Sequence, residues 1–257
     1  LRDDKTIQQL GNLKELVGIE RLKIALNFGP MPPKQAQAVL EIISFPPKLR
    51  RITFSIQQFE LVENQQQEVR FARMLNRLKE LSQLRSIEIK VRLTGQIELI
   101  NNIFDHLECG FPTLRALTFD IFADRNDAKP TRIAFVPLLR WISSHKELGY
   151  LSLILPYKTD DGFDEFMKEN DLHILPKLWY FNLACNYRDT NRQNLECFFN
   201  YISKLPSLSQ LQCNLIKFDP DMDVKSIISC LSEQKSLQNF ILYIGADNTD
   251  LERYLEF

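Results

Sequence analysis

One short spacing of apolar residues recurs along the whole chain. It consists of an apolar residue, two variable residues, and then three apolar residues separated by single variable ones, as in Leu49, Ile52, Phe54 and Ile56. Successive copies start about 30, 35, 30, 34, 30, 30 and 29 residues apart. The eight copies start at Ile19, Leu49, Leu84, Leu114, Leu148, Leu178, Leu208 and Leu237. A nearly constant period of this length is typical of repeat proteins that stack one structural unit on the next.

Each unit combines two periodicities. The last three apolar positions of a copy alternate with variable ones, which predicts a strand with one buried face. The segments before the copies follow helical spacing instead, at residues 39–43, 71–81, 100–107, 138–142, 195–205 and 224–231. Pro46, Pro47, Pro112, Pro176 and Pro206 lie just before strands, where proline ends a helix because it lacks an N–H group. The repeated unit is therefore a helix, a short turn and a strand.

Two other architectures contain similar elements. A doubly wound parallel sheet also alternates helices and strands, but its unit length is less regular and its strands are continuously apolar. It also carries a Gly-rich turn after its first strand, which this chain lacks. A helical-hairpin repeat is disfavoured by strand segments rich in β-branched and aromatic residues, such as Arg51–Ile56. We therefore expect a solenoid.

The units resemble leucine-rich repeats of the long, ribonuclease-inhibitor-like type. The family's core, L-x-x-L-x-L-x-x-N, is met most closely by Leu178–Asn186 and also by Ile19–Asn27. The resemblance covers essentially the whole chain and implies one α/β domain over residues 1–257. That domain would be a horseshoe of about eight repeats of roughly 30 residues, with parallel strands on the concave face and helices on the convex face.

The chain departs from the family at one position of the core. The Asn is replaced in six units, which have Gln57, Arg92, Phe122, Pro156, Ile216 and Gly245. This departure predicts a divergent, irregular solenoid. The two longest units contain Glu60–Gln67 and Ala123–Thr131, which we expect to be loop insertions.

The variable residues between the apolar positions of each strand point away from the core. On this face the first two units are basic, and the later units carry tyrosines among amides and small residues. Tyrosine supplies a large contact area at low entropic cost. Because solenoids commonly use the concave face for binding, we expect it to bind protein rather than to be merely solvated. The expected binding residues are Arg21, Lys23, Arg51, Tyr150, Tyr180, Asn182, Gln210, Gln212 and Tyr243.

The overall charge bears on the kind of partner. The chain has 32 basic and 33 acidic residues, for a formal net charge of -1. Dedicated nucleic-acid binders usually carry a basic excess, so we do not expect nucleic acid as the partner. Arg21 and Lys23, together with Lys48, Arg50 and Arg51, form a basic end. An acidic protein partner or plain solvation is favoured there over phosphate binding.

Patterns for catalysis and metal binding are weak. His106 and Cys109 are three residues apart on an expected helix, but no second pair has a matching spacing. Asp219–Asp223 starts like a calcium loop, yet the Gly and the Glu required at the sixth and twelfth positions are missing. Phosphate loops and G-x-S-x-G or H-E-x-x-H motifs do not occur. We therefore expect a protein that is not an enzyme and uses neither cofactor nor metal.

Cysteine usage favours an intracellular, cytoplasmic location. The 5 cysteines are odd in number and irregularly spaced, which disfavours a disulfide framework and fits a reducing compartment. No apolar run approaches the roughly 20 residues that cross a bilayer. Residue 1 is Leu rather than Met, and neither end resembles the polar cap of a solenoid, so we expect a longer chain.

The repeat and the lack of a catalytic pattern together predict a non-enzymatic scaffold or adaptor that binds protein on its concave face. One alternative is a structural subunit of a large multiprotein assembly. Two further alternatives, ranked lower, are the substrate receptor of a ubiquitin ligase and a regulator of a small GTPase.

Overall fold

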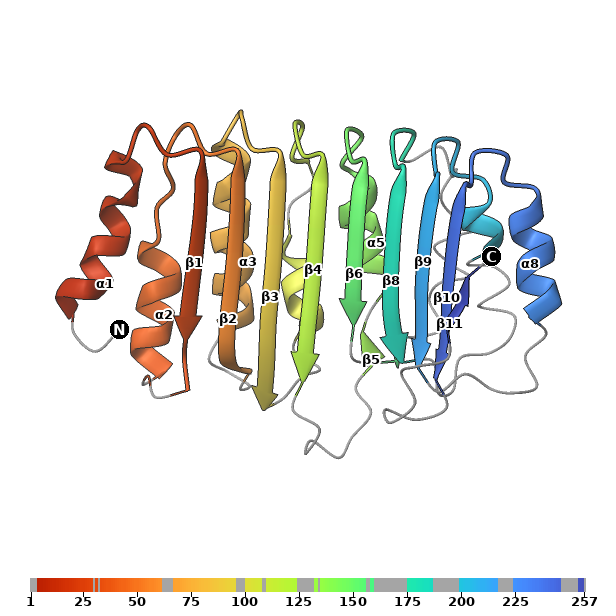
Figure 1. The fold of residues 1–257 in the computed structure, drawn as a ribbon. Coiled ribbons are helices and arrows are strands. Elements are labelled where there is room, and N and C mark those ends of the chain that lie inside the picture. The colour runs from red at the N-terminus through yellow and green to blue at the C-terminus, as the bar shows by residue number, and fades with distance from the viewer. Residues whose placement is uncertain are drawn as a thin grey trace. The chain divides into compact units, whose positions relative to one another are not determined.

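Parallel strands backed by helices form the described part of the chain, as seen in the computed structural model (Figure 1). The structure describes residues 4–29, 31, 33–61, 67–95, 100–107, 110–123, 132–133, 135–155, 158–159, 175–186, 199–216, 224–245 and 254–256. A strand forms at each of the eight predicted places, which confirms the α/β class. The strands are β1 (Arg21–Asn27), β2 (Arg51–Leu61), β3 (Ser86–Gly95), β4 (Ala116–Ala123), β6 (Tyr150–Leu155), β8 (Tyr180–Asn186), β9 (Gln210–Ile216) and β10 (Asn239–Gly245).

The chain divides into two compact units, unit 1 (Leu1–Lys129) and unit 2 (Pro130–Phe257). In unit 1, the strands β1, β2, β3 and β4 pair in chain order and are all parallel. In unit 2, the strands β6, β8, β9 and β10 do the same. The short strand β11 (Tyr254–Glu256) adds to β10 in the antiparallel direction, and β5 (Arg132–Ile133) pairs with β7 (Lys158–Thr159) separately.

The register of the strands follows the repeated apolar spacing. Equivalent positions of neighbouring repeats lie side by side, so that Ile52 pairs with Ile87 and Ile87 with Leu117. In unit 2, Leu151 pairs with Phe181, which in turn pairs with Leu211. All of these apolar side chains are buried. The prediction of one buried face per strand is therefore confirmed.

A ladder of backbone hydrogen bonds joins the turns that precede the strands. The N–H groups of Arg50 and Arg51 donate to the carbonyl oxygen of Glu20, at 2.8 and 3.0 Å. The N–H groups of Arg85 and Ser86 repeat this pattern on the carbonyl of Arg50, at 2.8 and 3.1 Å. Unit 2 has the same arrangement, as Trp179 and Tyr180 donate to Gly149. The repeats joined by these bonds therefore enter their strands in the same way.

The helices of each unit lie on one face of its strands (Figure 1). Aromatic contacts join the two layers, because the rings of Phe59 and Phe71 lie 5.5 Å apart and those of Phe104 and Phe119 lie 5.6 Å apart. Unit 1 contains α1 (Asp4–Gly11), η1 (Asn12–Glu15), α2 (Pro33–Ile42), α3 (Gln67–Asn76), η2 (Arg77–Glu80) and α4 (Ile100–Asp105). Unit 2 contains α5 (Phe135–Ser143), α8 (Val224–Ser232) and a helical stretch at residues 199–202.

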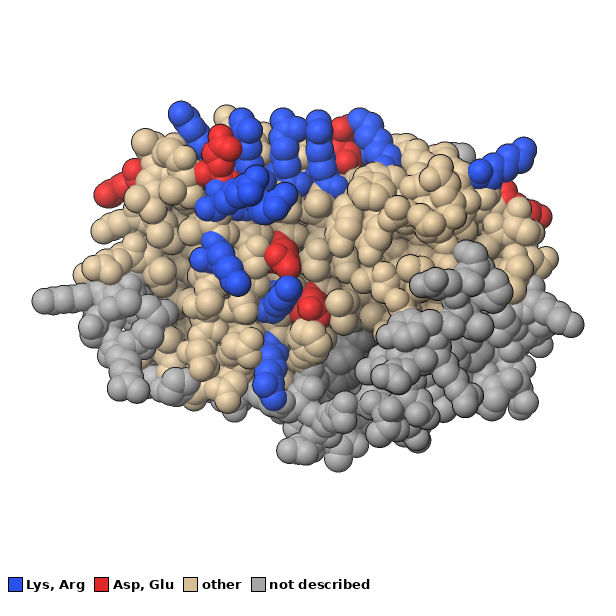
Figure 2. Space-filling model, viewed as in Figure 1, with Lys and Arg blue, Asp and Glu red and all other residues tan. Residues whose placement is uncertain are grey.

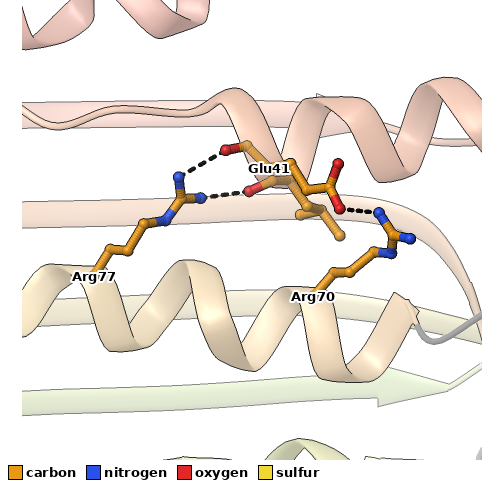
Figure 3. Close-up of polar contacts among 4 residues, drawn as sticks. Glu41, Arg70 and Arg77 are labelled. Atoms are coloured by element: carbon orange, nitrogen blue, oxygen red, sulfur yellow. Dashed lines mark hydrogen bonds and ion pairs between the residues drawn. The ribbon is translucent and has the colours of Figure 1, made fainter.

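Arg70 of α3 and Arg77 of η2 bind the end of the preceding helix, α2 (Figure 3). The Arg77 guanidinium donates to the carbonyl oxygens of Glu41 and Leu40, at 2.7 and 2.6 Å. These carbonyls belong to the last turn of α2, where a helix leaves its C=O groups without intrahelical partners. Arg70 of α3 forms an ion pair with the Glu41 carboxylate. Both contacts join one repeat to the next.

The first expected loop insertion, Glu60–Gln67, is partly wrong. Residues 60 and 61 extend β2, and residue 67 begins α3, while residues 62–66 lie outside the described chain. A bulge between Ile56 and Phe59 lets β2 continue, and Gln58 there has a positive φ of 52°. The Gln58 side chain covers Gly29, where a Cβ atom would lie 1.6 Å from its Oε1. Of the second insertion, Ala123 ends β4 and the rest lies outside the described residues.

Candidate protein-binding surface

The strand residues that alternate with the buried ones form a second surface, which we term the open face. It consists of Arg21, Lys23, Ala25, Arg51, Thr53, Ser55, Ser86, Glu88, Lys90, Ala116, Thr118 and Asp120 in unit 1. In unit 2 it consists of Tyr150, Ser152, Ile154, Tyr180, Asn182, Ala184, Gln210, Gln212, Asn214, Asn239, Ile241 and Tyr243. These residues are exposed or half-buried, apart from Asp120 and Ser152, which are buried.

Three aromatic side chains meet at the start of β6 and β8, and we term them the aromatic cluster: Tyr150, Trp179 and Tyr180. The two tyrosines occupy the same position on adjacent strands, and their rings stack in parallel with centroids 4.4 Å apart. The indole of Trp179 meets both rings edge-on, at 6.3 Å from Tyr150 and 5.8 Å from Tyr180. Trp179 remains 46% exposed. The cluster is therefore a pre-arranged aromatic surface that is still open to solvent.

Gly149 makes room for the exposed indole. It occupies the turn position that Trp179 occupies in the next repeat, and it is buried. A Cβ atom at residue 149 would lie 3.0 Å from Cδ1 and 3.1 Å from Nε1 of Trp179. That approach is closer than the usual contact distance of about 3.5 Å between non-bonded carbon atoms. The absence of a side chain at Gly149 thus allows the indole of Trp179, in the next repeat, to lie against it.

A hollow of about 370 Å³ adjoins the cluster on the same unit. It is lined by Tyr180, Gln210, Leu211, Gln212, Asn239, Phe240 and Ile241. The Tyr180 hydroxyl donates to Oε1 of Gln212 at 3.4 Å. Burial, and secondarily the neighbouring Tyr150, raises the pKa of Tyr180, so the hydroxyl stays protonated at neutral pH. Tyrosine and amide groups around a shallow hollow can exchange hydrogen bonds with a peptide backbone.

Asn182 extends this polar surface along β8. Its Nδ2 donates to the Ser152 hydroxyl at 3.0 Å, which fixes the amide group across two strands. Its Oδ1 is buried and accepts no hydrogen bond from the described residues. An acceptor in this state favours a ligand that brings an N–H or O–H group.

Unit 1 presents a different chemistry at the equivalent edge. Arg50, Arg85 and Arg115 come directly before β2, β3 and β4, and all three are exposed. Arg21 and Arg51 are the first residues of β1 and β2, and they lie side by side in the strand register. We term these five residues the arginine row. Figure 2 shows Lys and Arg side chains gathered along the edge where β1 to β4 begin.

Further along the strands of unit 1, acidic and basic side chains neutralise one another. Glu88 receives a hydrogen bond from Thr53 at 2.9 Å and pairs with Lys90 at 3.0 Å. The hydrogen bond from Lys90 is the main cause that lowers the pKa of Glu88. Asp120 is 7% exposed, and its burial raises its pKa to about 6 against the weaker effect of Lys90. Lys23, predicted as a binding residue, is exposed and lies beside Thr53 at this network.

The predicted binding residues thus fall into two separate groups. Arg21 and Arg51 belong to the arginine row, and Tyr150 and Tyr180 to the aromatic cluster. Gln210 and Gln212 line the hollow, while Tyr243 is half-buried on β10 opposite Tyr254 of β11.

Three residues escaped prediction, Arg85, Arg115 and Trp179, while Arg50 belongs to the predicted basic end but not to the predicted binding residues. They occupy the position before each strand, which the alternation rule assigns to neither face. The recurrence of arginine at the position before three successive strands is the sequence signal that would have found Arg85 and Arg115, and Trp179 has no such signal.

Only some of the weak candidates for chemistry fall within the described residues. Within the described ranges, no group of three or more His, Cys, Asp or Glu residues could hold a metal ion. His106 is exposed, and Cys109, His173 and the segment 219–223 lie outside those ranges. His145 is fully buried, with its ring 4.9 Å from that of Trp141, and burial lowers its pKa. His145 is therefore a neutral part of the core.

Comparisons with protein-family models and with curated proteins find no match to this chain. The resemblance to leucine-rich repeats consequently rests on the apolar spacing and the strand register. Among the described helices, none has both the length and the apolar character needed to span a membrane.

Proposed function

We propose that this chain is a non-enzymatic scaffold or adaptor of the leucine-rich-repeat kind, which binds another protein on the open face. The aromatic cluster carries the proposal. Trp and Tyr are enriched among the residues that dominate binding energy in protein interfaces, and they lose little conformational entropy on binding. An indole that is 46% exposed and held against two stacked tyrosines is already in position to be covered by a partner.

The surroundings of the cluster match the composition of a protein interface. An interface combines a desolvated apolar centre with a rim of hydrogen-bonding groups. Here the aromatic rings would form the centre, and the amides of Asn182, Gln210 and Gln212 would form the rim. An intracellular, cytoplasmic location would fit such a role, and the partner would be a single protein or a multiprotein complex.

Affinity capture with matched variants tests the proposal. The tagged parent, a Tyr150→Ala/Trp179→Ala double variant and an Ile228→Ala variant would each be incubated with extract of the source organism, and bound proteins quantified by mass spectrometry. Ile228 is the control, because it is 43% exposed but lies on helix α8. Two interface aromatics at about 2 kcal/mol each predict that the double variant loses about a hundredfold to a thousandfold in affinity.

The expected result is a protein that the parent and the Ile228→Ala variant capture equally and the double variant loses. Capture that is insensitive to the double variant would refute binding at the aromatic cluster. Capture lost only by Ile228→Ala would favour the structural-subunit alternative, in which the helical face is buried in an assembly.

A further inference from the structure

The arginine row of unit 1 has no explanation in the fold itself. The backbone groups of Arg50, Arg85 and Arg115 form the turn ladder, and any residue other than proline can donate these bonds. The equivalent positions of unit 2 carry Gly149, Trp179, Ser209 and Gln238 in the same ladder. The ladder therefore does not require arginine.

The row also works against stability in the absence of a ligand. Neighbouring parallel strands lie about 4.8 Å apart, so Arg50, Arg85 and Arg115 follow one another at roughly that spacing. Arg21 and Arg51 face each other directly in the register, an arrangement that is destabilising for like charges. Among the described residues, Arg50 of the row pairs with Glu20 at 3.7 Å. Arg21, Arg51, Arg85 and Arg115 form no ion pair with any residue that the structure describes.

We infer that the arginine row binds an acidic, extended segment of a protein partner. This inference names the partner's chemistry and rests on the proposed function. An arginine guanidinium presents a planar fork that matches a carboxylate in a two-bond geometry, and it is weakly hydrated compared with lysine. Five such groups, of which Arg50 alone forms an ion pair among the described residues, favour an anion with several carboxylates over a single ion.

The shape of the charged area favours a peptide over nucleic acid. The row is narrow along the strands. The acidic residue Glu88 lies two residues beyond Ser86, the first residue of β3, which is about 7 Å along the strand. Asp120 lies further along on the same face. Lys23 and Lys90 lie beside these two acids, so the excess positive charge lies at the strand starts, which a single extended peptide can cross.

The described open-face residues of unit 1 also place no aromatic group beside the row on which a base could stack. Single-stranded nucleic acids are bound by basic grooves in which aromatic side chains stack on the bases. No aromatic residue occupies the first three outward positions of the strands β1, β2, β3 and β4. The exposed Phe122 lies six residues beyond the start of β4, about 20 Å away.

Fluorescence anisotropy with defined probes tests this inference. The full chain would be titrated into a labelled ten-residue peptide of alternating Glu and Ser, and separately into a labelled ten-nucleotide single-stranded RNA, at about 50 mM salt. The test variant is Arg50→Gln/Arg85→Gln/Arg115→Gln. The matched control is Arg140→Gln/Lys204→Gln/Lys235→Gln, which removes the same charge from exposed positions of unit 2. Circular dichroism checks that each variant is folded.

We expect the parent to bind the acidic peptide, the row variant to bind it at least tenfold more weakly, and the control to change by less than twofold. An Arg→Lys variant at the same three positions should lie between the parent and the row variant, because lysine keeps the charge and loses the fork. Equal weakening in the control, or an absence of saturable binding, would overturn the inference. Tighter, row-dependent binding of the RNA would replace the peptide with nucleic acid. Capture through the aromatic cluster is measured independently, so either result can fail without the other.

Discussion

Replacing Leu151 with aspartate tests the packing of unit 2 most sharply. Leu151 is 2% exposed and points into the core between strand and helix layers. It lies in register with Phe181 on β8, and that residue lies in register with Leu211 on β9. A carboxyl group at this position would face a row of apolar side chains that offers it no hydrogen-bond donor of its own.

The size of the effect follows from two losses. Truncating a buried leucine costs about 2–5 kcal/mol, since apolar contacts are lost and a cavity remains. Burying an unpaired carboxyl group adds several kcal/mol, or forces the group to become neutral. The sum is about 5 kcal/mol or more, which is comparable to the whole stability of about 5–15 kcal/mol expected for a domain. We therefore expect Leu151→Asp to unfold unit 2, or to leave it barely stable, at pH 7.

Urea unfolding followed by tryptophan fluorescence measures this effect directly. Both tryptophans of the chain, Trp141 and Trp179, lie in unit 2, so their emission reports that unit. Leu151→Ala is the control for lost volume, and Tyr150→Ala is the control on the open face, with an expected cost below about 1 kcal/mol. Stability of Leu151→Asp within 1 kcal/mol of the parent would refute the strand register.

A pH series separates the charge from the cavity. Burial raises the folded-state pKa of the introduced carboxyl above its unfolded value of about 3.9. The neutral form is then tolerated better, so the penalty should shrink as the pH falls from 7 toward 4. Each value is compared with the parent at the same pH, because the pKa of buried His145 is lowered and its protonation destabilises unit 2 below pH 6.5. A penalty that did not change with pH would show that water reaches the site.

Three further predictions concern other contacts. Arg77→Met should lower the free energy of unfolding of unit 1, measured by urea unfolding, by about 1–3 kcal/mol, because two carbonyls of α2 lose their donor. Arg73→Met, at an exposed position of α3, should have little effect. Asp120, whose pKa is raised to about 6, should make unit 1 more stable at pH 5 than at pH 7.5 by about 1.4 kcal/mol, because only part of the shift acts over this pH range. Hydrogen exchange should show this gain, and Asp120→Asn should abolish it. Gly149→Ala should shift the Trp179 emission and weaken partner capture severalfold, with a stability change below about 1 kcal/mol, and unchanged emission would contradict the contact.

The strands could be predicted from the sequence because their pattern is local and repeated. Alternation at Ile52, Phe54 and Ile56 specifies a buried face, and the constant spacing places equivalent residues side by side. The bulge in β2 could not be predicted in this way. It depends on Gln58 adopting a positive φ and on its side chain covering Gly29, which is a contact between two neighbouring repeats of unit 1.

The candidate site was predictable only where it follows alternation. Tyr150 and Tyr180 are outward residues by that rule, and their stacking follows from the register. Trp179 and the arginines before β2, β3 and β4 precede the first alternating position, so their exposure depends on the geometry of the turn. The burial of Asp120 and Ser152 on the open face likewise depends on neighbouring side chains, which a single strand's pattern does not specify.

The most direct test of protein binding on the open face is hydrogen–deuterium exchange with and without the captured partner. Peptides that cover residues 149–154 and 179–184 should become protected in the complex, while peptides from helices α5 and α8 should exchange as in the isolated chain. Protection confined to α5 and α8, with residues 149–154 and 179–184 unchanged, would contradict the account.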